Sequence, residues 1–323
     1  MIKKRICILG GTGFLGQTLA NQLSDAGYRI RILTRHREAS RRDLIVLPKL
    51  ELIETDIHSQ ESLNHHFKNC DVVINLVGIL NERGRKGLGF HHAHVALAEK
   101  ILEACHQNKI RRVLQMSALN ANAEDAPSHY LRSKGEAETV LQQDKSLQLT
   151  CFRPSVIFGK NDSFFNRFVF LLKTTPLVFP LACPRALFAP VWVEDVARAF
   201  VQSINDKDSF GEHYCLCGPN TYSLRELVEY TRHCLNIRRK LIPLSDGLSR
   251  LQAALFDFVP GKPFSTDNYL STKVDSVCKN NDLLNLGITP TALEAIVPRY
   301  LSAHNQRARY QEFRKHSRRS SIL

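Results

Sequence analysis

Four glycines fall within seven residues near the start of the chain, directly after an apolar run. Residues 6–16 read ICILGGTGFLG. Each glycine costs conformational entropy and offers no side chain for packing, so this stretch requires bare backbone. A strand, a glycine turn and a helix in succession form a cradle for phosphate, because the start of the helix presents unpaired N–H groups and a positive dipole end. The stretch therefore predicts an anion site where a strand meets a helix.

The spacing of these glycines is G-x-x-G-x-x-G, one residue longer at its start than the common dinucleotide fingerprint. Gly10 permits the tight turn, Gly13 lets the backbone approach a pyrophosphate, and Gly16 lets the helix pack against the strand. A plain tight turn is the competing interpretation. The strand before it, the helix after it and the pattern downstream favour a dinucleotide. We assign to its phosphate site Gly10, Thr12, Gly13, Phe14, Leu15 and Gly16.

Short apolar runs alternate with helical patterns through the first half of the chain, which predicts a parallel sheet with crossover helices. We expect strands at residues 6–9, 29–34, 50–54, 72–77, 112–117 and 148–153, with helices at 17–26, 59–68, 90–107 and 130–143. The predicted fold class is α/β, a Rossmann-type doubly wound parallel sheet with a smaller mixed C-terminal region. The expected domains are a dinucleotide-binding domain at 1–155, a substrate or partner region at 156–300 that returns some strands to the sheet, and a basic tail at 301–323.

The end of the second expected strand bears on the choice of dinucleotide. An NAD site usually has an acidic residue there, which holds the ribose 2′-hydroxyl. This strand instead ends in Thr34-Arg35-His36-Arg37, with Arg41 and Arg42 beyond. A guanidinium at Arg35 would pair with a 2′-phosphate. We therefore favour NADP(H), while NAD(H) and a merely solvated basic loop stay open.

Two further residues are assigned to the adenine end of the site. Asp56 and Ile57 follow the third expected strand, where they would flank the adenine. For Asp56 the competing interpretation is a helix N-cap.

Candidate catalytic residues follow the fifth expected strand. Ser117 ends that strand, and Tyr130 and Lys134 are four residues apart, so on a helix they share a face. An ammonium and an oxidised nicotinamide would favour the phenolate of Tyr130, which could then exchange a proton with a substrate oxygen. Ser117 would donate to that oxygen, and Lys134 would also hold the nicotinamide ribose. A surface helix with a packed tyrosine and a solvated lysine remains the alternative.

These residues carry a resemblance to a known family. The motifs GGTGFLG, NLVG, YLRSK, FRPSVIFG and PVWVEDVA resemble the atypical and extended short-chain dehydrogenase/reductases, which include epimerases and dehydratases. The segments CGPNTYSLREL, LSRLQAALFDFVPGKPF and LGITPTALE resemble one branch, the nucleotide-binding accessory subunit of respiratory complex I and its bacterial relatives. The resemblance extends to about residue 300. The remaining residues assigned to the cofactor site are Leu76, Val77, Gly78 and Pro154, together with Tyr130 and Lys134.

The resemblance implies an NADP(H)-binding protein of the complex I accessory type. In that branch Ser117, Tyr130 and Lys134 match the catalytic set of the superfamily, but Tyr130 and Lys134 could simply hold the ribose. Two alternatives stay open. One is an active NAD(P)-dependent oxidoreductase or epimerase with an unknown carbonyl or hydroxyl substrate. The other is a sensor of the NADPH/NADP ratio.

The net charge of +13 indicates an anionic partner. Beyond the dinucleotide we expect a membrane respiratory complex or an anionic membrane surface. Nucleic acid is not expected, since the basic residues are dispersed and not interleaved with aromatics. Residues 248–264 predict an amphipathic helix and a proline turn, which would cover a substrate mouth, rest on a membrane or pack in the core. The tail carries Arg307, Arg309, Arg314, Lys315, Arg318 and Arg319, and would meet anionic lipid or an acidic protein, or stay solvated.

The nine cysteines are scattered, and only Cys215 and Cys217 are close in sequence. No second Cys/His pair at zinc spacing accompanies them, so we expect no metal site. Buried thiols in a reducing compartment are the expectation. The N-terminus does not have the pattern of a signal peptide. We therefore expect a cytoplasmic protein, or one peripheral on the inner face of a membrane.

Overall fold

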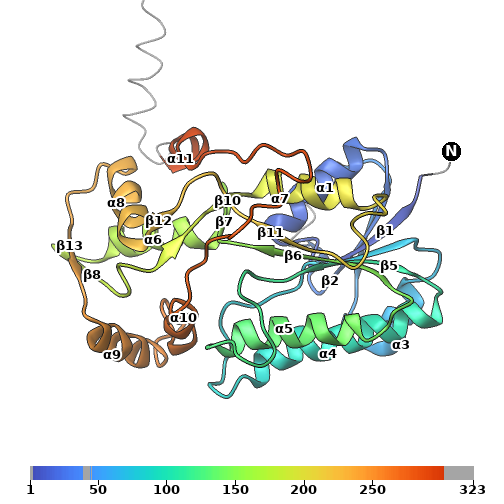
Figure 1. Cartoon of the computed structure of the whole chain (residues 1–323), viewed down its shortest axis with the longest axis horizontal. Coiled ribbons are helices and arrows are strands. Elements are labelled where there is room, and N and C mark those ends of the chain that lie inside the picture. The colour runs from blue at the N-terminus through green and yellow to red at the C-terminus, as the bar shows by residue number, and fades with distance from the viewer. Residues whose placement is uncertain (1–2, 39–43, 45, 302–323) are drawn as a thin grey trace, which may run out of the picture.

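The structure of the chain is a computed structural model that describes residues 3–38, 44 and 46–301 (Figure 1). Arg41, Arg42 and the predicted basic tail from residue 302 onward lie outside the described residues.

A seven-stranded sheet forms the centre of the fold, in the order β11-β6-β5-β4-β1-β2-β3. Every neighbouring pair is parallel. The strands are β1 (Arg5–Leu9), β2 (Arg29–Thr34), β3 (Leu50–Glu54), β4 (Val72–Asn75), β5 (Arg112–Met116), β6 (Gln148–Pro154) and β11 (His213–Leu216). The order reverses between β1 and β4, and open α/β sheets bind ligands outside the carboxyl ends of the strands at such a point. The predicted α/β, doubly wound fold class is confirmed.

Helices cover both faces of the sheet (Figure 1). One layer holds α1 (Phe14–Asp25) and α7 (Val193–Ser203), and the other holds α3 (Gln60–His66), α4 (Leu88–Gln107) and α5 (His129–Gln142). Successive strand residues point to opposite faces. In β1, Ile6 and Ile8 therefore pack in the first layer, while Cys7 and Leu9 pack in the second. Burial on both faces explains why these strands are apolar along their whole length.

The second half of the chain builds a smaller mixed region and also contributes β11 and α7 to the main sheet and its cover. Its short strand pairs are β7 (Ile157–Phe158) with β10 (Val191–Trp192), β9 (Leu187–Phe188) with β12 (Tyr222–Ser223), and β8 (Val178–Leu181) with β13 (Lys240–Pro243). Its other helices are α6 (Ser163–Thr174), α8 (Leu224–Cys234), α9 (Asp246–Phe256), α10 (Thr266–Ser271) and α11 (Leu293–Leu301). A capping box formed by Ser223 and Glu226 begins α8, where the sequence reads Ser-Leu-Arg-Glu. Among the described helices, none combines the length and the apolar character needed to cross a bilayer.

The expectation of free thiols alone is wrong for one pair of cysteines. Cys217 and Cys278 form a disulfide, although 61 residues separate them. They meet because the side chain of Asn281 holds the segment against the end of β11, accepting from the Cys217 N–H and donating to the Cys217 carbonyl. Cys7, Cys70, Cys105 and Cys151 are buried thiols, as expected.

Candidate functional site

The glycine turn between β1 and α1 leaves no room for a side chain at Gly10 or Gly16. Gly10 has a φ of +76°, a conformation that favours glycine. A Cβ on Gly10 would lie 3.1 Å from the Leu76 carbonyl carbon and from the Val77 nitrogen, which are backbone atoms beyond β4. A Cβ on Gly16 would come within 2.5 Å of the Gly10 oxygen and the Gly11 backbone. The turn is therefore packed against the end of β4 and against its own helix.

The N-terminus of α1 offers its N–H groups outward. Its N-cap residue is Gly13, which has no side chain to cap the helix, and the first turn contains no acid. A Cβ on Gly13 would approach only the Gly10 oxygen, at 3.3 Å, so the space beside this residue is otherwise open. Thr12 lies in the same turn, and its carbonyl accepts from Gln17 Nε2 at 3.1 Å. Phe14 and Leu15 anchor the start of the helix in the core. This open cradle of N–H groups fits a diphosphate.

Arg35 projects from the end of β2 into solvent, at the same edge of the sheet as the glycine turn. The pKa of His58, in the loop after β3, is lowered mainly by burial of the imidazole. The charge of Arg35 adds to this effect, so Arg35 lies near that loop. In this loop Asp56 accepts from the His58 N–H at 2.8 Å, and Ile57 is buried. Ser59 caps α3, so the alternative of Asp56 as that helix's N-cap is wrong.

Lys134 bridges the carboxyl ends of two neighbouring strands. Its Nζ donates to the Val77 carbonyl at 3.0 Å and to the Met116 carbonyl at 3.2 Å, and a Cβ on Gly78 would lie 3.1 Å from it. The side chain is 3% exposed. Burial lowers the pKa of Lys134 to about 8, against the opposing effect of the Glu138 charge. At neutral pH the site therefore holds an ammonium ion at the β4–β5 crevice.

Tyr130 lies one helical turn before Lys134, between the rings of Phe90 and His94, with centroids 6.0 and 5.8 Å away. Burial raises its pKa to about 12, and the charge of Asp267 adds to the shift. Among the described residues, no hydrogen bond to the phenol oxygen is found. Asp267 in α10 accepts from the backbone N–H groups of His129 and Tyr130, at 2.7 and 3.2 Å. The smaller region thus fixes the start of the helix that carries Tyr130.

His94 is a residue of this site that sequence reasoning missed. Its Nε2 accepts from the Ile79 N–H at 3.2 Å, and its Nδ1 lies 2.8 Å from the Ser133 hydroxyl. Ser133 donates in turn to the Tyr130 carbonyl at 2.9 Å. Burial, followed by the charge of Lys134, lowers the pKa of His94 to about 2, so the ring is neutral. His94 therefore ties the loop after β4 to α5. In sequence it is one of several histidines on an amphipathic helix, which gives no signal for this role.

Ser117 directly follows Met116, whose carbonyl accepts from Lys134. It is 3% exposed, and its hydroxyl makes no hydrogen bond of normal geometry within the described residues. It lies close enough to the Glu138 carboxylate to help lower the pKa of that group. Although burial raises the Glu138 pKa, hydrogen bonds from Arg153 and His213 outweigh that effect.

Glu138 is buried and forms an ion pair with the partly exposed Arg153. Arg153 donates to both carboxylate oxygens, from Nε at 2.9 Å and from Nη2. Ligand atoms of Glu138, Cys151 and His213 lie within 4.8 Å of one another. The bidentate guanidinium already neutralises the carboxylate, so this cluster does not favour a metal cation. Pro154 ends β6, and its carbonyl accepts from the Leu119 N–H at 3.0 Å.

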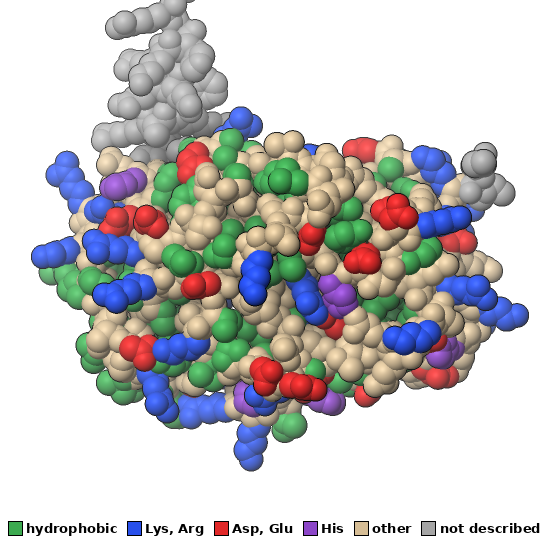
Figure 2. All heavy atoms as spheres, viewed as in Figure 1, with side chains coloured by type: hydrophobic (Ala, Val, Ile, Leu, Met, Phe, Trp, Pro, Cys, Tyr) green, Lys and Arg blue, Asp and Glu red, His purple; other side chains and the backbone are tan. Residues whose placement is uncertain are grey.

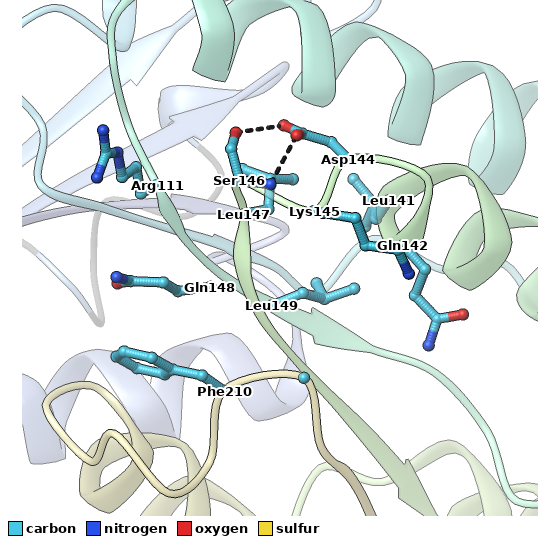
Figure 3. A pocket seen from close by; sticks show the side chains of 11 residues that line it. Arg111, Leu141, Gln142, Asp144, Lys145, Ser146, Leu147, Gln148, Leu149 and Phe210 are labelled. Atoms are coloured by element: carbon cyan, nitrogen blue, oxygen red, sulfur yellow. Dashed lines mark hydrogen bonds between the residues drawn. The ribbon is translucent and has the colours of Figure 1, made fainter.

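A surface hollow of about 760 Å³ lies elsewhere on the molecule (Figure 3). Arg111 and Gln148, at the amino ends of β5 and β6, line it together with Asp144 and Phe210. The glycine turn, Arg35 and Lys134 lie at the carboxyl ends of the strands. The hollow is therefore separate from the site described above.

Comparisons with known proteins give a family and a fold that agree with this α/β sheet and its glycine turn. Residues 6–217 match the family described as the NAD dependent epimerase/dehydratase family. The chain is 30% identical over 297 residues to the "NADH dehydrogenase [ubiquinone] 1 alpha subcomplex subunit 9, mitochondrial" of Mus musculus, covering 89% of this chain and 77% of that protein. The protein of that name from Arabidopsis thaliana is 28% identical over 310 residues, covering 91% and 76%. A Staphylococcus aureus nucleoside-diphosphate-sugar epimerase has the same fold, with a TM-score of 0.72 and 20% identity over 92% of this chain and 99% of its own.

Proposed function

The chain belongs to the NAD dependent epimerase/dehydratase family and to the branch of the complex I alpha subcomplex subunit 9, and on this premise we propose that it is a dinucleotide-binding accessory protein. Its cofactor would be a nicotinamide dinucleotide, with NADP(H) preferred. The observation that carries the proposal is the uncapped start of α1, beside a turn in which Gly10 and Gly16 leave no room for a side chain. Its partner would be a membrane respiratory complex, as the names of the relatives suggest. It would then be located at the inner face of the membrane.

Each part of the cofactor would meet a different group of residues. The N–H groups around Gly13 would bind the diphosphate, and Arg35 the 2′-phosphate. Asp56 and Ile57 would flank the adenine, and Leu76, Val77 and Gly78 would lie beneath the ribose and diphosphate. Lys134 would donate to ribose hydroxyls beside the nicotinamide. When bound, the dinucleotide supplies the capacity for hydride transfer.

An active oxidoreductase or epimerase is the alternative, and the shared α5 face of Tyr130 and Lys134 favours it. The phenol, with a pKa of about 12, would be the proton donor to a substrate oxygen. The Ser117 hydroxyl lies near Glu138, so its role beside that oxygen is the weakest part of this alternative. For this reason we place cofactor binding first.

Native mass spectrometry of the purified full-length chain, with melting curves in NADPH and NADH, tests the proposal. We expect a co-purifying dinucleotide, and a rise in melting temperature that is larger with NADPH. Tyr130→Phe should retain this rise, since the phenol oxygen is not needed for an accessory role. Turnover of a carbonyl substrate that disappears in Tyr130→Phe would instead support the oxidoreductase. If no dinucleotide co-purifies and neither cofactor raises the melting temperature, the proposal is wrong.

The affinity for NADPH is expected to fall as the pH rises above about 8. Burial holds the pKa of Lys134 near 8 in the free protein, and ribose hydroxyls as acceptors would favour its ammonium form. Above pH 8, binding must then take up a proton, and the affinity should fall by up to about tenfold per pH unit. The neighbouring groups do not titrate in this window, because the pKa of His94 is about 2 and that of Tyr130 about 12.

Calorimetric titrations at pH 7, 8 and 9, each in two buffers of different ionisation enthalpy, would measure both the affinity and the proton uptake. Lys134→Met should bind more weakly and without this pH dependence. An affinity of the wild-type protein that stays constant from pH 7 to 9 would contradict the role of Lys134.

A further inference from the structure

Helix α9 presents its large apolar side chains to solvent. Leu248, Leu251 and Leu255 are 52%, 55% and 59% exposed, while Ser249 and Ala253 are the buried residues of this helix. A helix of a globular protein normally places its leucines toward the core. Of the three alternatives that the sequence left open for this helix, packing of its leucines in the core is therefore wrong. Its inner face is held by polar contacts, among them Ser249, which accepts from the Cys183 N–H at 3.1 Å.

The apolar face continues beyond the end of the helix. Phe258 is 77% exposed and Val259 is 41% exposed. We call Leu248, Leu251, Leu255, Phe258 and Val259 the α9 surface. In Figure 2, hydrophobic side chains gather at the left end of the molecule, where Figure 1 places α9, β8 and β13, with Lys and Arg side chains among them.

A basic loop lies beside the α9 surface. The guanidinium of Arg85 stacks on the Phe258 ring at 4.0 Å from its centroid. The ammonium of Lys262 donates to the Gly84 carbonyl at 2.7 Å, which fixes the loop to the turn after α9. Arg83 and Lys86 flank Arg85 in this loop and are exposed, as is Arg250 on α9 itself. In the described part of the chain, neither Arg83, Lys86 nor Arg250 takes part in an ion pair.

The acids of the same segments are already satisfied by the protein. Glu82 is 7% exposed and accepts from the N–H groups of Gly87 and Gly89. Asp257 accepts from the N–H and the hydroxyl of Thr266. Asp246 pairs with Lys273 and accepts from the Tyr269 hydroxyl. Asp246 has a cation partner, and Glu82 and Asp257 are held by donors of the protein itself. The exposed charges of these described segments that lie outside ion pairs therefore include three cations, Arg83, Lys86 and Arg250.

We propose that the α9 surface and the loop with Arg83, Arg85 and Lys86 dock the protein on an anionic lipid bilayer. An amphipathic helix with leucines on one face and cations beside it inserts its apolar side chains at the headgroup boundary, while the cations meet anionic headgroups. The leucines stand on a helix at the edge of the molecule (Figure 1), with unpaired cations next to them. The core of a protein interface is by contrast depleted of charge, so a bilayer fits better than an acidic protein face. This inference needs no bound dinucleotide.

Sedimentation of the full-length chain with lipid vesicles, without added dinucleotide, tests the inference. We expect binding to phosphatidylcholine vesicles that contain phosphatidylglycerol, little binding to phosphatidylcholine alone, and weaker binding at high salt. The double variant Leu251→Gln/Leu255→Gln should lose about tenfold in partitioning for each leucine. Arg83→Gln/Lys86→Gln should lose about fivefold for each charge.

Control variants separate docking from folding. Leu284→Gln replaces a leucine that is 63% exposed outside the α9 surface, and it should bind vesicles as the wild type does. Melting curves of all variants should agree, because the substituted side chains are exposed and because, on α9, glutamine and leucine have similar helix propensities. Every variant keeps the basic C-terminal tail. Vesicle binding that persists in the leucine variant would thus come from another part of the chain and would overturn the inference. A wild-type chain that stays in the supernatant would overturn it as well. So would a finding that α9 contacts another protein and no lipid.

Discussion

Gly13→Val is expected to weaken the binding of NADPH and of NADH alike by about 100-fold. The space beside Gly13 is open except for the Gly10 oxygen at 3.3 Å, so a valine side chain would occupy the place where we propose a diphosphate. Two hydrogen bonds from N–H groups to a charged phosphate would be lost, worth about 3 kcal/mol together. That free energy corresponds to about 100-fold in affinity.

The fold should survive this substitution. Gly13 has a φ of −75° and a ψ of 177°, an extended conformation that any residue adopts. A valine at an N-cap position is unfavourable by about 1 kcal/mol, which the free energy of unfolding in urea would report. Fluorescence titration with each dinucleotide would measure the affinity.

Two other glycines calibrate the result. Gly247→Val introduces the same side chain where nothing lies within 4 Å of the new Cβ, and it should leave the dinucleotide affinity unchanged. Gly16→Ala should instead destabilise the whole protein, because its Cβ would collide with backbone at 2.5 Å. Unchanged affinity in Gly13→Val would refute the phosphate site in this turn.

Arg35→Ala is expected to weaken NADPH binding by about tenfold and to leave NADH binding nearly unchanged. A guanidinium paired with a 2′-phosphate is worth about 1.5–3 kcal/mol. Because Arg35 is exposed, screening by solvent and salt places the effect at the lower end of that range. NADH has no phosphate at this position, so its affinity should not depend on the residue. The difference between the two cofactors should shrink as the salt concentration rises.

Arg29→Ala is the matched control, since Arg29 is also exposed and lies at the opposite end of the same strand. Titrations of both variants with both cofactors give four affinities to compare with the wild type. An equal loss for NADPH and NADH in Arg35→Ala would mean that the residue does not read the 2′-phosphate. No loss of affinity for either cofactor would mean that Arg35 belongs to a solvated basic loop, the alternative that the sequence left open.

The sequence predicts most of the central sheet because the signals for it are local. The expected strand at 29–34 matches β2, and the expected helix at 130–143 differs from α5 by one residue at each end. Alternating apolar runs, a glycine turn and a capping box each act within a few residues. The same locality makes the turn from Gly10 to Gly16 recognisable before any tertiary contact is known.

The sequence is less informative where a residue's role depends on distant neighbours. Tyr130 and Lys134 share a helical face in any reading, but the acid that fixes the start of their helix is Asp267, 137 residues beyond Tyr130. Packing between separate elements likewise decides three other features. These are the proximity of Ser117 to Glu138, the disulfide between Cys217 and Cys278, and the hydrogen bond from the Ile79 N–H to the His94 ring.

By itself the sequence therefore determined the α/β class, the glycine turn and the basic end of β2, since short-range backbone sterics and side-chain periodicity fix these features. Only the tertiary structure decided which face of α9 meets solvent, because an amphipathic pattern identifies two faces but not which one the rest of the chain covers. The tertiary structure also decided which residues surround Tyr130 and Lys134. Their burial, and with it their pKa values, arises from segments that come together only in the folded chain.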